Sequence, residues 1–115
     1  MNINSSGKTR SFESGSIRDD ATGKPAMELL PLDLLMRVAT WYALGAEKYG
    51  EDNWRLGQPQ KKVIGSLLRH LAKYRMGDTS EDHLAAVVWN ALCLMHVDEY
   101  LKDTPLFNGK YDFKK

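Results

Sequence analysis

The sequence lacks most of the features that mark secreted and membrane proteins. It has one cysteine, Cys93, so it cannot form an internal disulfide, and a lone thiol is typical of a reducing compartment. This cysteine lies in an apolar run, where a buried small side chain is favoured over a nucleophile. No apolar run approaches the roughly 18 residues of a membrane span, and the start lacks a signal-peptide stretch. We therefore expect a cytoplasmic protein.

Charge of one sign and several well-known catalytic motifs are also missing. The 16 basic and 15 acidic residues leave a net charge of +1, which provides no field for binding DNA, RNA or an anionic membrane. There is no Walker phosphate loop and no nucleophile elbow. One cysteine and three scattered histidines do not give the spacing of a closed tetrahedral zinc site.

What is present is helical periodicity. Apolar residues recur at helical spacing over about 32–48, 60–75 and 81–101. Pro31 favours a helix start, Gly50 and Gly77 favour helix ends, and residues 78–80 are candidate N-caps. No alternating run of strand length appears, so the sequence predicts an all-α bundle of three main helices. A chain of 115 residues builds a modest core, which homo-oligomerisation would complete.

The composition divides the chain into three parts. Residues 1–25 are rich in Ser, Gly and charge and are interpreted as an arm or loop. Residues 26–102 form the predicted helical domain. Residues 103–115 are a polar tail with Pro105 and aromatic residues, which is either docked through its aromatics or disordered.

Two acidic groups are candidate metal sites. Glu47 and Glu51 are four residues apart and share one face if the helix continues through Gly50; the alternative is a solvated helix end. The second group consists of Asp78, Glu81, Asp82 and His83. One carboxylate is enough to cap a helix, and three repel one another unless a cation or basic group is near. A bundle can bring both groups together, and oxygen-rich ligands favour Mg²⁺ or Mn²⁺.

Further residues are candidates for binding a substrate. Arg69 and Lys73 are one helical turn apart and suit phosphate oxygens, although a solvated basic face is the simpler interpretation. Trp54 and Tyr49 suit stacking on a base, but such residues more often belong to a core. The full set of substrate-binding candidates is Arg18, Lys24, Lys48, Asn53, Trp54, Arg69, His70, Lys73 and Asn90. His70 is more often a satisfied interior histidine, and Asn90 fits a core hydrogen bond and a ligand contact equally well.

An ordered series of motifs resembles a known family. The segments are GAEKYGEDNW (45–54), LRHLAKY (68–74), GDTSEDHLA (77–85) and Asn90, preceded by RDD, GKP and LLP within 18–31. Together, over about residues 14–100, they resemble the phage and bacterial dATP/dGTP diphosphohydrolase family. That family is grouped with the MazG-like, all-α nucleoside triphosphate pyrophosphohydrolases.

The resemblance implies Mg²⁺ or Mn²⁺ and cleavage of a purine deoxynucleoside triphosphate to the monophosphate and pyrophosphate. It also implies a homo-oligomer, a dimer or tetramer, and a similarity to phage enzymes that supply or drain purine deoxynucleotides during phage DNA synthesis. The motif residues carried over by position are Glu47, Asp78, Glu81, Asp82 and His83. We predict as catalytic residues Glu47, Glu81, Asp82 and His83, and as metal ligands Glu47, Glu51, Asp78, Glu81 and Asp82. The Glu-Glu-x-x-Glu and Glu-x-x-Asp strings of the wider MazG-like enzymes are absent. A protein that binds a nucleotide or cyclic dinucleotide without cleaving it, or a purely structural helical subunit, stays open.

Overall fold

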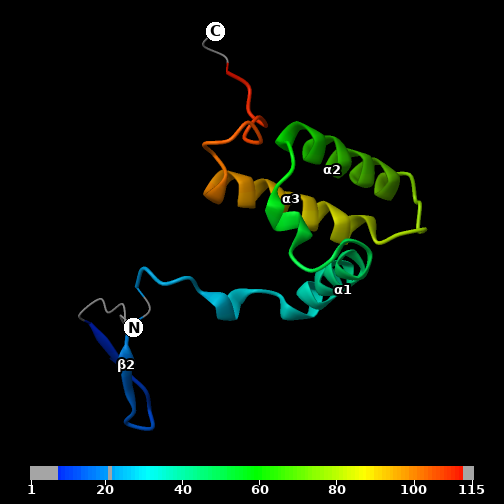
Figure 1. The fold of residues 1–115 in the computed structure, drawn as a ribbon. Helices are drawn as coiled ribbons and strands as arrows, with labels where there is room; N and C mark the ends of the chain where they lie inside the picture. Colours follow the sequence, from blue (N-terminus) through cyan, green and yellow to red (C-terminus); the bar gives the residue numbers. More distant parts are fainter. Residues whose placement is uncertain (1–7, 21, 113–115) are drawn as a thin grey trace. The chain divides into compact units, whose positions relative to one another are not determined.

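The computed structural model describes residues 8–20 and 22–112, which fall into two compact units, Met1–Pro31 and Leu32–Lys115. The second unit is helical and confirms the predicted fold class (Figure 1). Its elements are α1 (Leu32–Tyr49), the short 3-10 helix η2 (Asn53–Leu56), α2 (Gln60–Arg75) and α3 (His83–Tyr100).

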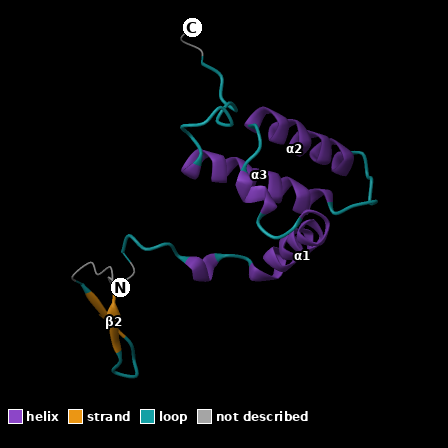
Figure 2. Ribbon diagram, in the orientation of Figure 1, coloured by secondary structure: helices purple, strands orange, loops and turns teal. Residues whose placement is uncertain are grey.

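The first unit contains a small antiparallel hairpin that the sequence analysis did not predict (Figure 2). The hairpin consists of β1 (Thr9–Ser11) and β2 (Ile17–Asp19), and the 3-10 helix η1 (Met27–Leu29) follows it in the same unit. The turn is closed by the Phe12 N–H, which donates to the Ser16 carbonyl at 3.0 Å, and by the Gly15 N–H, which donates to the Phe12 carbonyl at 2.8 Å. Strands of three residues are too short to show alternation in a sequence, so the interpretation of residues 1–25 as an arm or loop did not include them.

The helix ends follow local signals. α1 begins directly after Pro31 and ends at Tyr49, because Gly50 adopts the left-handed region with a φ of +93°. α3 begins at His83, about two residues later than predicted. Its N-cap is Asp82, whose carboxylate accepts the Ala85 N–H at 3.2 Å. The three candidate caps at 78–80 therefore lie in the preceding loop.

α2 and α3 lie side by side and run in opposite directions, and α1 packs against α3 (Figure 1). Small side chains dominate the buried apolar core, which consists of Val63, Ala85, Ala86, Cys93 and Val97. Apolar residues at helical spacing are therefore not all buried, since Met95 and Leu68 are 57% and 55% exposed. α3 is apolar almost all round, so periodicity alone does not identify its buried face.

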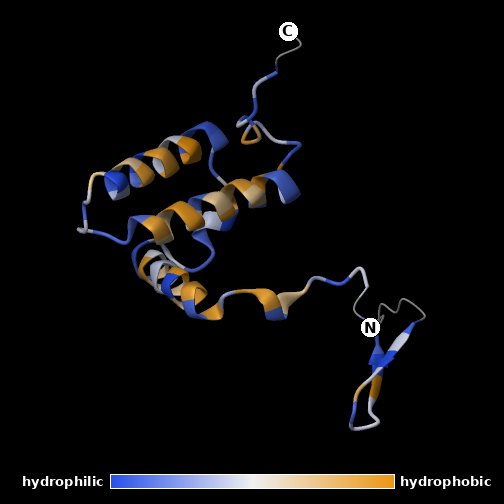
Figure 3. Ribbon diagram, turned by 180° about the vertical axis from the view of Figure 1, so that it is seen from behind, coloured by the Kyte–Doolittle hydropathy of each residue, from blue (hydrophilic) through white to orange (hydrophobic). Residues whose placement is uncertain are grey.

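Much of the remaining apolar surface is exposed. Leu34, Met36 and Leu44 on α1 are 59%, 72% and 57% exposed. Hydrophobic stretches on the helices are visible in Figure 3. Within the described chain, none of the helices combines the length and the apolar character needed to cross a membrane. Exposed apolar surface of this kind is typical of an interaction site.

Gln60 joins α2, α3 and the C-terminal segment. Its side chain is 3% exposed and donates to the Leu94 carbonyl at 3.2 Å and to the Asp98 carboxylate at 2.8 Å. Its amide oxygen accepts the Gly109 N–H at 3.0 Å, and its backbone N–H donates to the Leu106 carbonyl. The segment 103–112 is thus docked by polar contacts, while the aromatic residue Phe113 lies outside the described residues.

Candidate functional site

A buried histidine begins α3 and contacts two ionisable groups. His83 is 2% exposed, and its Nε2 lies 2.8 Å from Asp78 Oδ2. Its Nδ1 lies 2.9 Å from Nδ1 of His70 on α2. The hydrogen bond with His83, and then those with the hydroxyl and N–H of Ser80, lower the pKa of Asp78 to about 2. Asp78 is therefore a fixed anion that orients the His83 ring.

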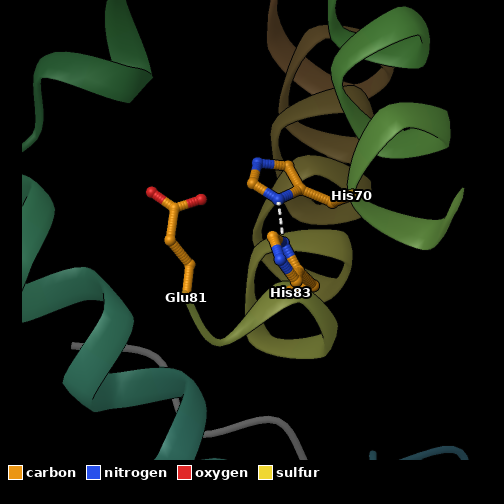
Figure 4. A group of neighbouring side chains, drawn as sticks. All are labelled: His70, Glu81 and His83. Carbon is orange, nitrogen blue, oxygen red and sulfur yellow. Dashed lines mark hydrogen bonds between the residues drawn. The ribbon is translucent and has the colours of Figure 1, made fainter. Parts of the chain in front are cut away.

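Glu81 completes a group of three potential metal ligands. One ligand atom each of His70, Glu81 and His83 lies within 4.8 Å of the other two. Figure 4 shows that the Glu81 side chain rises from the loop before α3 and that its carboxylate lies beside the two imidazole rings. Among the residues with described positions, this is the one group of its kind, and it includes none of the other predicted acidic ligands.

The environment of His70 favours its neutral form. Burial is the largest cause that lowers the pKa of His70, and His83 and nearby cations act in the same direction against the opposing effect of Glu81. The rings of Trp41 and His70 form a T-shaped pair with centroids 5.8 Å apart. A neutral imidazole offers a lone pair to a metal ion or a proton.

Asp82, predicted as a catalytic and metal residue, is held by an arginine. Arg37 donates from Nε to Oδ2 and from Nη2 to Oδ1, each at 2.6 Å, and this fork lowers the pKa of Asp82. The same carboxylate caps α3 through the Ala85 N–H. The repulsion expected among the acidic residues at 78–83 is thus relieved here by a basic group, one of the two possibilities that the sequence left open.

The condition under which Glu47 and Glu51 would share one face, a helix that continues through Gly50, is not met. α1 ends at Tyr49 and Gly50 reverses the chain, so Glu51 does not lie one turn beyond Glu47 on a continuous helix. Glu51 instead lines a concavity of about 370 Å³, together with Asn53 and Trp54. Trp89 of α3 also lines this concavity, and the sequence analysis did not single it out.

Two residues of α3 have structural surroundings. Asn90 is 2% exposed and its Nδ2 donates to the Ala86 carbonyl at 2.8 Å, which supports the core hydrogen bond over the ligand contact. Cys93 is buried, and desolvation raises its pKa to about 11. A thiol with so high a pKa is a poor nucleophile at neutral pH, which agrees with its interpretation from the sequence.

The predicted basic residues lie in several places. Arg69 and Lys73 are exposed on α2, the helix that carries His70, and Lys48 lies 5.1 Å from the centroid of the Tyr49 ring. In the first unit, Arg18 and Lys24 line a concavity of about 720 Å³.

Arg10 lines the same concavity and stands directly opposite Arg18 in the hairpin. Like charges directly opposite each other on a hairpin are destabilising unless an anion lies near. Arg10 is not among the predicted substrate-binding residues, because strands this short leave no alternation in the sequence.

The ring of Trp54, for which stacking on a base was considered, is surrounded by other side chains. Its ring makes T-shaped contacts with Tyr42 and His96, at centroid distances of 5.7 and 5.3 Å. The guanidinium of Arg55 lies 4.5 Å from the ring centroid. Trp54 is therefore part of an aromatic cluster and also a wall of the 370 Å³ concavity.

Comparison with protein families gives one match. The sequence model of the family described as "dATP/dGTP diphosphohydrolase, N-terminal" matches residues 14–104, most of the chain. Neither the curated proteins nor the solved structures give a match. The matched range covers the three helices and β2, and it contains His70, Glu81 and His83.

Proposed function

Because this chain belongs to the dATP/dGTP diphosphohydrolase N-terminal family, we propose that it hydrolyses dATP or dGTP to the monophosphate and pyrophosphate. The observation that carries the proposal is the cluster at the start of α3. There, an exposed carboxylate lies beside two imidazoles and an oriented aspartate, within the segment that the family match covers. Two groups of this cluster, Asp78 and His70, have lowered pKa values, and perturbed pKa values of neighbouring groups are typical of a reaction site.

In the proposed reaction, water attacks the α- or β-phosphorus, and the bond from that phosphorus to the oxygen bridging the two breaks. A divalent ion held at Glu81 would neutralise phosphate charge and lower the pKa of the attacking water. The sequence predicted Mg²⁺ or Mn²⁺ for this role. The structure supports Glu81 as a ligand more than it supports Asp82, whose two oxygens both accept hydrogen bonds from Arg37.

Basic residues have a clear role in such a reaction. Arg69 and Lys73 lie on the helix that carries His70, and their charges would stabilise the developing negative charge on pyrophosphate. In the first unit, Arg18 and Lys24 line one concavity with Arg10, and we keep Arg18 and Lys24 as predicted substrate-binding residues. The aromatic concavity lined by Trp54 and Trp89 suits a purine base.

A nucleotide-binding protein without hydrolytic activity is the second candidate. It is favoured by one observation: the concavity with the aromatic walls is lined by neither Glu81 nor either histidine of the cluster. Binding there, of a nucleotide or a cyclic dinucleotide, would not require the cluster. Metal-independent binding with intact recovery of the ligand would support this function against hydrolysis.

The test is incubation of the protein with each of the four dNTPs, with Mg²⁺ or Mn²⁺, followed by anion-exchange chromatography. We expect dAMP or dGMP and pyrophosphate, with little turnover of dCTP and dTTP. Recovery of intact dATP and dGTP, or of diphosphate and inorganic phosphate, would contradict the proposal.

We also propose that the protein is a cytoplasmic homo-oligomer, a dimer or tetramer, that has no DNA, RNA or membrane partner. The exposed apolar residues of α1, Leu34, Met36 and Leu44, support self-association because a second copy would remove them from water. Light scattering coupled to size-exclusion chromatography should give a mass at least twice that of the 13.0 kDa chain. A monomer at micromolar concentration would contradict this.

A further inference from the structure

Two imidazoles and one carboxylate approach one another at the end of the α2–α3 pair where residues 76–82 connect the two helices (Figure 4). We propose that His70, His83 and Glu81 form a site for one first-row divalent transition metal ion, such as Mn²⁺, Co²⁺ or Zn²⁺. The ligand atoms are Nδ1 of each histidine and a carboxylate oxygen of Glu81. The site differs from the oxygen-only set that the sequence predicted, and it forms without a nucleotide.

The distances suit a shared ion. Metal–nitrogen and metal–oxygen bonds are about 2.0–2.2 Å long, so two ligands of one ion lie roughly 3–4 Å apart. The two Nδ1 atoms are 2.9 Å apart, and all three ligand atoms lie within 4.8 Å of one another. His70 and His83 are fixed by two packed helices, whereas Glu81 is exposed on a loop and free to close the remaining gap.

Asp78 is the positioning residue of the site. Its Oδ2 lies 2.8 Å from His83 Nε2, which keeps the proton on that nitrogen and leaves the Nδ1 lone pair directed at His70. The carboxylate itself is held by the Ser80 hydroxyl at 2.9 Å and the Ser80 N–H at 3.2 Å. A carboxylate behind a histidine ligand is the usual support of a metal site.

The donor set distinguishes the metal class. Mg²⁺ prefers six oxygen ligands and gives up its water reluctantly, whereas two imidazoles with one carboxylate suit Mn²⁺, Fe²⁺, Co²⁺ and Zn²⁺. Asp82, which would supply a further oxygen, already accepts two hydrogen bonds from Arg37. Three protein ligands leave coordination positions open for water or a phosphate oxygen.

The test is isothermal titration of metal-free, nucleotide-free protein with ZnCl₂, CoCl₂, MnCl₂ and MgCl₂. We expect one ion per chain, with affinity rising from Mn²⁺ through Co²⁺ to Zn²⁺ and with Mg²⁺ the weakest. Absence of binding by Zn²⁺ and Co²⁺, or Mg²⁺ bound as tightly as Mn²⁺, would overturn the proposal. Because no nucleotide is present, the result is independent of whether the protein hydrolyses dNTPs.

Matched variants locate the ion. His70→Gln should lower Zn²⁺ affinity by more than the roughly 10- to 100-fold that loss of an outer partner costs, while His96→Gln should leave it unchanged. His96 is a suitable control because its Nε2 contacts the Arg55 carbonyl, away from the cluster. If His70→Gln does not fold, as judged by circular dichroism, Glu81→Gln serves, with Glu99→Gln as its control. Wild-type affinity in a folded His70→Gln or Glu81→Gln protein would overturn the site.

The positioning role of Asp78 has its own readout. Asp78→Asn should weaken Co²⁺ binding by about 10- to 100-fold and shift the visible absorption bands of the bound Co²⁺, because the orientation of its histidine ligand changes. A purely structural aspartate would leave these bands in place once the site is saturated. Unchanged affinity and unchanged bands would overturn the assignment.

Discussion

The α2–α3 pair has a nearly inaccessible polar side chain at each end, and the two are satisfied in different ways. Gln60, 3% exposed, has one ionisable partner, Asp98, besides the Leu94 carbonyl and the Gly109 N–H. His83, 2% exposed, has two ionisable partners, Asp78 and His70. The amide of Gln60 cannot change its protonation or bind a metal in place of a proton, whereas the imidazoles of His83 and His70 can. We therefore interpret the Gln60 end as structural and the His83 end as chemical.

The largest loss of activity is expected when a charge is removed at the His83 end. Glu81→Gln should reduce pyrophosphate release from dATP or dGTP by at least about 100-fold, because a neutral amide is a poor ligand for a divalent ion. Glu81 is exposed, so the melting temperature should stay within about 2 °C of the wild type.

A steady-state assay with each purine dNTP measures the effect, with Glu99→Gln as the matched exposed control. Wild-type turnover in Glu81→Gln, or equal losses in both variants, would contradict the chemical interpretation of this end.

The opposite pattern is expected at the Gln60 end. Gln60→Leu leaves the Gly109 N–H and the Leu94 carbonyl without their side-chain partner, and it should lower the free energy of unfolding by about 2–3 kcal/mol. Activity per folded molecule should be retained. Urea denaturation measures the loss, and Gln58→Leu, at an exposed loop position, should change it by less than about 0.5 kcal/mol. Equal stability of the two variants would show that the buried amide is dispensable.

Gly57 tests how closely the chain packs near the Gln60 end of the α2–α3 pair. Its φ is +87°, and an added Cβ would lie 2.5 Å from Leu101 Cδ1 and 2.9 Å from Leu106 Cδ1. Gly57→Ala should therefore cost about 2 kcal/mol from backbone strain and crowding together.

Gly50 is the control for strain without crowding. It has a φ of +93° and no atom within 4 Å of an added Cβ, so Gly50→Ala should cost only about 1 kcal/mol. Thermal unfolding of both variants separates the two contributions, and an equal cost would argue against close packing at Gly57.

The smallest expected effect concerns pH. Hydrogen bonds from Gln60 and then Lys110 lower the pKa of Asp98 below its usual value. The ionised carboxylate therefore stabilises the fold above the unfolded pKa of about 3.9, and this contribution is lost as pH falls through the lower folded pKa. Carboxyl NMR titration should show the Asp98 midpoint below the usual value, and Lys110→Met should raise it. An unchanged midpoint in Lys110→Met would exclude this ion pair.

The residue contacts between α2 and α3 could have been predicted from the sequence. Two antiparallel helices joined by a short loop bring together residues equidistant from that loop, and His70 and His83 lie on either side of Gly77 at nearly equal separations. Gln60 and Leu94 are likewise equidistant from it. The three helices, the helix end at Gly50 and the family resemblance were all predicted from local sequence signals.

Other features depend on tertiary contacts that no local pattern encodes. Arg37 and Asp82 are 45 positions apart, so the arginine that holds the α3 cap carries no sequence signal. Exposure of Met95 depends on which face of α3, a helix that is apolar almost all round, meets α2. Whether Glu47 contributes to a site stays a prediction, because its exposed position on α1 is outside the ligand group that the structure forms.

One measurement tests the central claim, that the cluster at the start of α3 is where chemistry on a nucleotide occurs. Protein loaded with Mn²⁺ and with a dATP analogue carrying a methylene bridge between the α- and β-phosphorus is studied by pulsed EPR. We predict that a single bound Mn²⁺ shows coupling to imidazole ¹⁴N and to ³¹P of the analogue, and that His70→Gln reduces the ¹⁴N coupling. Mn²⁺ that couples to ³¹P without ¹⁴N, or to neither nucleus, would contradict the account.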